Sequence, residues 1–204
     1  RPKRLVQTWL TEASTHRLLT ASVGNEPSLA DVVKMVNPQP KDAEQAAVFA
    51  WLIGKPFDMN ALPQVIPDYE MVKRGVSTDL PDVPFQMLTH LDLSTAQWTS
   101  IAKNMGWQAL RINLNTLLRH GVFNDVTMVD FVAARLRDEQ SIRKAKAFPY
   151  QLLMAYQAAK QEMPVVISEA LQDALEHSLV NVPHLAGKKV VVCPDVSGSM
   201  QSPA

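Results

Sequence analysis

The residues best suited to chemistry lie near the end of the chain, in the run Asp195-x-Ser197-x-Ser199. One carboxylate and two hydroxyls on a tight loop supply hard oxygen ligands, which suit Mg²⁺ or another divalent cation. A plain strand-to-helix turn that uses Asp and Ser as caps would need the same residue types. The neighbouring sequence offers no general base to activate either serine, so we predict that the chain is not an enzyme.

Basic side chains form a second group with chemical potential. The stretch from Arg135 to Lys146 is rich in cations, and its densest part is Arg143, Lys144 and Lys146. Such a patch can bind the phosphates of a nucleic acid, and binding would then depend steeply on salt. An exposed pair of helices would carry the same charges without any ligand, so both interpretations stay open.

Five further polar residues are candidates for nucleic-acid contact. Lys34 and Asn37 are three residues apart on the polar face of a predicted helix, which could equally be a solvated face. Arg111 lies next to an apolar stripe. Arg119 and His120 fall in the last turn of a predicted helix, where they could instead complement the helix dipole, worth about 0.3–1 kcal/mol.

The composition limits the partners. The chain has 204 residues and 20 basic against 20 acidic side chains, so a nucleic-acid surface must be a local patch. A single cysteine rules out an internal disulfide and fits a cytoplasmic protein. The first residues lead into an amphipathic segment rather than a signal peptide, and no apolar run is long enough to span a membrane. We expect neither a membrane nor DNA as a partner.

Apolar residues at the spacing i, i+3, i+4, i+7 predict a series of amphipathic helices. We expect them over residues 29–36, 42–53, about 94–105, 107–118, about 125–136, 150–160 and 164–179. Residues 56–84 contain five prolines and predict short helices and loops. Consecutive helices with short loops pack as antiparallel pairs, so we predict a mainly α helical-repeat array.

The four tryptophans are too widely spaced to suggest a base-stacking platform. Trp98 and Trp107 lie on apolar stripes, which favours packing in the core.

The pattern changes after residue 180. Residues 181–188 look like a linker, and the β-branched run Val190 to Cys193 predicts a buried parallel strand. A loop that follows such a strand lies at the carboxyl edge of an α/β sheet, where ligands bind. Because only four residues follow Met200, we predict that this second domain is truncated.

Long segments of the chain carry a resemblance to a known family. The segments are residues 21–38 (ASVGNEPSLADVVKMVNP), 107–123 (WQALRINLNTLLRHGVF) and 147–156 (AFPYQLLMAY). In order and spacing they resemble the Ro/TROVE family of RNA-binding proteins, and its bacterial branch most closely. The DVSGSM loop that follows resembles the metal-ion-dependent adhesion site of a von Willebrand factor A domain.

The resemblance implies a domain organisation. Residues 1–180 would be TROVE helical repeats without their first helices, part of a ring of HEAT-like repeats. Residues 181–188 would be the linker, and 189–204 the first strand and metal loop of the A domain. That family site also takes ligands from later loops, which lie beyond residue 204, so we expect metal binding by this chain to be weak or absent.

The resemblance also implies a function. Family members bind small structured Y-type RNAs and the single-stranded 3′ ends of misfolded RNAs, they act in RNA quality control, and bacterial members can pass RNA to an exoribonuclease. The alternative is a protein-interaction scaffold in which an A domain holds its partner through the metal.

One departure from the family affects the RNA contacts. The family usually has histidine before the proline at position 38 and lysine after it, whereas this chain has Asn37 and Gln39. Two contacts have lost charge or aromatic character, which weakens the expectation of Y-type RNA binding through the family's usual contacts.

Overall fold

The computed structural model describes residues 2–24, 26–159 and 162–183, together with the isolated residues 186, 187, 189, 191 and 193. The predicted metal ligands Asp195, Ser197 and Ser199 lie outside the described residues, and so do Val190 and Val192 of the predicted strand. The expectations for the A domain and its divalent cation therefore stay predictions.

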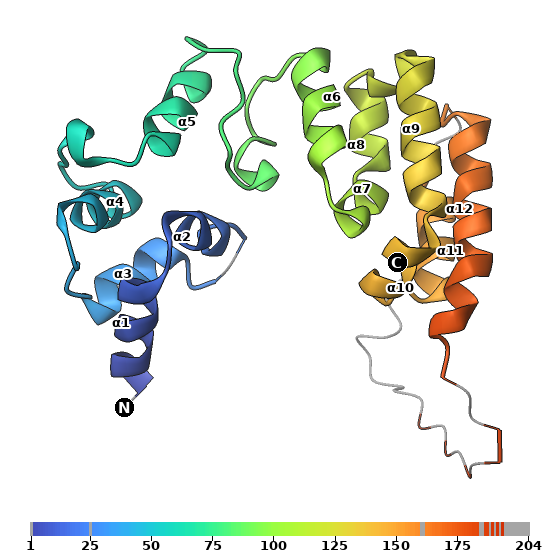
Figure 1. The fold of residues 1–204 in the computed structure, drawn as a ribbon, viewed down its shortest axis with the longest axis horizontal. Helices are drawn as coiled ribbons and strands as arrows, with labels where there is room; N and C mark the ends of the chain where they lie inside the picture. The colour runs from blue at the N-terminus through green and yellow to red at the C-terminus, as the bar shows by residue number, and fades with distance from the viewer. Residues whose placement is uncertain are drawn as a thin grey trace. The chain divides into compact units, whose positions relative to one another are not determined.

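Every regular element in the described part of the chain is a helix, which confirms the predicted mainly α fold (Figure 1). The chain forms two compact units, Arg1–Met128 and Val129–Ala204, and the boundary between them falls within α9. Among the described residues, no helix combines the length and the hydrophobicity that a membrane span requires.

The first unit is a succession of short helices, with η marking a 3₁₀ helix. In chain order its elements are α1 (Pro2–Glu12), α2 (Thr15–Ala21), α3 (Leu29–Val36), α4 (Ala43–Ile53), η1 (Met59–Ala61), α5 (Val65–Lys73), η2 (Phe85–Met87), α6 (Thr95–Asn104), α7 (Trp107–Ile112), α8 (Leu114–Arg119) and η3 (Val122–Asn124).

Side-chain caps begin these helices where the sequence predicts them. Ser28 accepts a hydrogen bond from the backbone N–H of Asp31 at the start of α3 (3.2 Å). Ser94 and Gln97 form a reciprocal capping box at the start of α6. Trp98 and Trp107 are buried, at 1% and 6% exposure, which confirms their expected place in the core.

The second unit contains the rest of the array. Its elements are most of α9 (Val126–Arg137), then α10 (Glu139–Ala145), α11 (Pro149–Ala158), α12 (Val165–Ser178) and η4 (Leu179–Asn181). Packing brings α11 and α10 against α12. The buried stripe of α12 has the helical spacing and consists of Ile167, Ala170, Leu171 and Ala174.

The observed helices differ from the sequence-based expectation in two ways. The single helix predicted over residues 107–118 is broken at Asn113, whose side-chain amide donates to the carbonyl of Ala109 (2.8 Å). The backbone N–H of Asn113 donates to the same carbonyl (3.0 Å), so this carbonyl accepts from both the side chain and the backbone of Asn113. Helices α1, α2 and α10 were not in the predicted series, and α10 has only seven residues and one buried side chain, Ile142.

Two adjacent leucines of α11 give a matched test of this packing. Leu152 is fully buried and Leu153 is 45% exposed. We expect Leu152→Ala to lower the free energy of unfolding by about 2–5 kcal/mol, because it opens a cavity. Leu153→Ala should change it by less than about 0.5 kcal/mol. Urea unfolding followed by circular dichroism measures both, and equal losses would contradict the packing of α11.

Candidate nucleic-acid interface

A groove with a volume of about 310 Å³ lies beside α3 and α4. Its polar lining consists of Lys34, Asn37 and Lys55, all of which are exposed. The rest of its lining is apolar: Val33, Pro38, Pro40, Ala46, Phe49, Ala50 and Ile53. Two ammonium groups and one carboxamide around an apolar floor, with no carboxylate in the lining, favour a ligand that combines negative charge with flat apolar parts.

The end of α3 positions Asn37. This residue has φ 47° and ψ 66°, in the left-handed region that asparagine tolerates better than most residues. Its backbone N–H donates to the carbonyl of Val33 (2.9 Å) and closes the last turn of the helix. The side-chain amide of Gln7 in α1 donates to the carbonyl of Val36 (2.6 Å) and ties this helix end to α1.

The end of α4 positions Lys55, which sequence reasoning missed. Gly54 takes φ 71°, and the N–H of Lys55 then donates to the carbonyl of Ala50 (2.9 Å). This left-handed turn directs the chain back beside the last turn of α4. The available signal was the helix-ending glycine, but only the packing of α3 against α4 places Lys55 in the same groove as Lys34.

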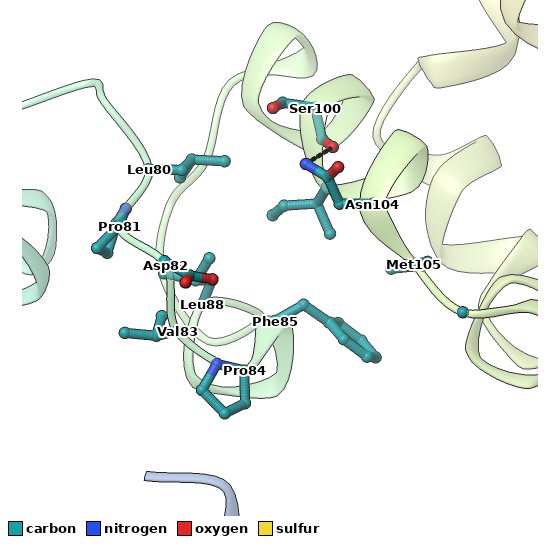
Figure 2. Close-up of a pocket in the computed structure, with 12 residues that line it drawn as sticks. Leu80, Pro81, Asp82, Val83, Pro84, Phe85, Leu88, Ser100, Asn104 and Met105 are labelled. Carbon is teal, nitrogen blue, oxygen red and sulfur yellow. Dashed lines mark hydrogen bonds between the residues drawn. The ribbon is translucent and has the colours of Figure 1, made fainter. Parts of the chain in front are cut away.

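A larger hollow, of about 420 Å³, is lined by α6 and the loop before it (Figure 2). Its polar side chains are Asp82, Ser100 and Asn104, and the Asn104 amide donates to the carbonyl of Ser100 (3.2 Å). The hollow has a carboxylate and no cationic side chain in its lining. It is therefore a poorer place for phosphate than the smaller groove.

Arg111 is half-buried and already engaged. Its guanidinium donates to the side-chain carbonyl of Gln108 (3.0 Å from Nη2) and lies 6.0 Å from the ring centroid of Trp107. These contacts hold the charge against α7, and Arg111 is not among the residues that line the groove.

His120 packs against the core, while its neighbour Arg119 is exposed. The imidazole lies flat on the ring of Trp98, with centroids 4.3 Å apart and planes 17° from parallel. Burial lowers the pKa of His120, Arg119 lowers it further, and Asp92 partly opposes them. The imidazole is therefore neutral at pH 7 and offers no charge to phosphate.

The remaining predicted cations, Arg143, Lys144 and Lys146, lie in the second unit at the end of α10. All three are exposed, and none has an ion-pair partner among the described residues. Lys146 caps the helix in the left-handed region, with φ 49°. This part of the chain thus supplies a second exposed basic surface.

Short helices joined by turns make up both compact units, as expected for a HEAT-like helical array. The family model that matches the chain is that of the TROVE domain, over residues 31–187. The match covers well over half of the sequence, and the chain belongs to the TROVE-domain family.

One solved structure supports the same fold. The crystal structure of the Deinococcus radiodurans Ro (RSR) protein superposes with a TM-score of 0.61 at 23% sequence identity. The alignment covers 89% of this chain and 42% of that one, so the chain spans less than half the length of that protein. No curated protein matches the sequence.

The stacked histidine predicts a pH dependence of stability. The pKa of His120 is lowered from its ordinary value of 6.5, so protonation favours the unfolded chain. The contribution of neutral His120 to the free energy of unfolding should be fully present above pH 6.5. It should be lost as the pH falls below 6.5 through the pKa that His120 has in the folded chain. His120→Phe keeps a ring on Trp98 but cannot titrate, so the difference between the two proteins isolates this group.

Urea unfolding at pH 7.5 and pH 5.5 measures the effect. The loss between the two pH values should be larger for the original chain than for His120→Phe. An equal loss would show that His120 is not the titrating group.

Proposed function

We propose that this chain is an RNA-binding scaffold of the Ro type and that the groove beside α3 and α4 contacts RNA. The observation that carries the proposal is the pairing of Lys34 with Lys55 over an apolar floor that no carboxylate lines. Lysines bind phosphate as point charges, and the apolar floor suits the flat face of a sugar or base. Membership of the TROVE-domain family supports the same ligand.

The finer expectations belong to the same proposal. The RNA would be a small structured Y-type RNA, an unpaired 3′ end, or both, in a cytoplasmic role in RNA quality control. An exoribonuclease would be a protein partner. The chain itself would not catalyse a reaction, and Asp195, Ser197 and Ser199 would bind a divalent cation only together with ligands from later loops of an A domain.

A double substitution tests the groove. We expect Lys34→Gln with Lys55→Gln to weaken binding of a fluorescent hairpin RNA that has a single-stranded tail, measured by anisotropy across a salt series. Each lost phosphate contact should reduce the slope of log affinity against log salt by about one. Lys73→Gln is the matched control, because Lys73 lies on α5 beside Glu70 (3.8 Å) and outside the groove.

The outcomes separate the two candidate functions. A flatter salt slope for the double variant alone supports the groove. If all three proteins bind the RNA equally, the groove is not the contact surface. If none binds RNA while the chain captures an exoribonuclease, the protein-interaction scaffold is the better account.

The departure from the family at positions 37 and 39 gives a gain-of-function test. Histidine, like asparagine, tolerates the left-handed backbone of residue 37, and position 39 is exposed. We expect Asn37→His with Gln39→Lys to tighten hairpin binding and to steepen its salt slope by about one, because it adds one full charge. Unchanged binding would mean that these positions do not touch the RNA.

A further inference from the structure

Two exposed aromatic rings lie side by side where α10 gives way to α11. Phe148 is the residue before α11, and Tyr150 lies in its first turn. Their centroids are 6.4 Å apart and their planes are 21° from parallel. Phe148 is 37% exposed and Tyr150 is 64% exposed, so much of this aromatic surface faces solvent.

The turn that presents the rings is held in one conformation. The side-chain amide of Asn181 donates to the carbonyls of Ile142 (3.2 Å) and Ala147 (2.8 Å), both of which belong to fully buried residues. The N–H of Phe148 donates to the side-chain carbonyl of Gln151 (3.1 Å). The rings therefore stand on a backbone that is fixed before any ligand arrives.

Cations precede the rings directly. Arg143, Lys144 and Lys146 are exposed, and no acidic residue occurs from position 143 to position 150. Lys146 and Phe148 are two residues apart, so their backbones are within about 7 Å of each other. One or two nucleotides can therefore meet an ammonium group with a phosphate and an aromatic ring with a base.

We propose that Phe148 and Tyr150 form a base-stacking platform for single-stranded RNA, with Arg143, Lys144 and Lys146 holding its phosphates. This inference rests on the proposed RNA-binding function and adds a second site in the other compact unit. Aromatic rings beside a basic groove are the usual means of binding unpaired strands without sequence preference.

The charges and the rings together select this ligand. A paired duplex keeps its base faces inside the stack, so it could use the cations but not the rings. An apolar protein partner could use the rings but would leave the three cationic side chains, Arg143, Lys144 and Lys146, without counter-charges. An unpaired RNA strand satisfies both groups.

Conservative substitutions at Tyr150 test the stacking. We expect Tyr150→Leu to weaken binding of a fluorescein-labelled ten-nucleotide oligo(A) RNA on the order of tenfold, the effect of losing one stacked base. Tyr150→Phe keeps the ring and should bind as the original chain does. Tyr156→Leu is the matched control, since Tyr156 is 40% exposed on the same helix and lies ten or more residues along the chain from Arg143, Lys144 and Lys146.

The same RNA annealed to its complement separates stacking from charge attraction. The Leu variant should bind the duplex as well as the original chain does. Equal single-strand binding by Tyr150→Leu and the original chain would overturn the platform. If Lys34→Gln with Lys55→Gln weakens hairpin binding while Tyr150→Leu leaves oligo(A) binding unchanged, the platform is rejected and the proposed function stands. If the original chain binds no RNA at all, both are rejected.

A variant of Lys146 removes a charge without cost to the fold. Lys146 lies in the left-handed region with φ 49°, which glycine adopts without steric cost. Lys146→Gly should therefore be at least as stable as the original chain. We expect it to weaken oligo(A) binding and to reduce the salt slope by about 0.7, the contribution of one phosphate contact on a single strand. An unchanged slope in a stable variant would exclude Lys146 from the site.

Discussion

Both candidate RNA surfaces depend on the same kind of hydrogen bond. In each, a carboxamide side chain from a helix far along the chain donates to backbone carbonyls at a helix end. In the first unit, Gln7 donates to the carbonyl of Val36 (2.6 Å), 29 positions along the chain. In the second, Asn181 donates to the carbonyls of Ile142 and Ala147, more than 30 positions away. Leaving the carbonyl of the fully buried Ala147 unpaired would cost about 1–3 kcal/mol. These amides therefore decide how the chain leaves one helix and enters the next, and so where the exposed side chains of the turn stand.

The reliance on helix ends follows from the length of the helices. The α-helices of six to fourteen residues are marginal alone, and they persist because each buries one face against its neighbours. Because the apolar faces of the helices pack in the core, the exposed turns are the parts that can bind a ligand. Functional loops on a rigid scaffold commonly work in this way. Asn37 and Lys55, which line the groove, follow α3 and α4, and the aromatic pair follows α10. One architectural rule thus accounts for both surfaces.

Local signals in the sequence predicted most of the helices. The features that the sequence could not predict depend on tertiary contacts. The stripe and the serine cap define α3 over Leu29–Val36 as the structure has it, because apolar spacing and capping act within one helix. The break at Asn113, whose side chain and backbone both donate to the carbonyl of Ala109, is not revealed by the spacing of apolar residues. Lys55 joins Lys34 only because α4 packs on α3. The aromatic pair was missed for a similar reason: Phe148 and Tyr150 stack through the geometry of a turn that Asn181 holds from far along the chain.

We expect RNA to contact the side chains presented at the helix ends that the carboxamides of Gln7 and Asn181 hold. Photo-cross-linking of an oligo(U) RNA containing 4-thiouridine, followed by peptide mapping of the 204-residue chain, tests it most directly. We expect cross-links within residues 143–150 and in the peptides that carry Lys34 and Lys55, and these cross-links should disappear when unlabelled RNA competes. Cross-links confined to other helices, or spread evenly over the exposed lysines, would contradict it.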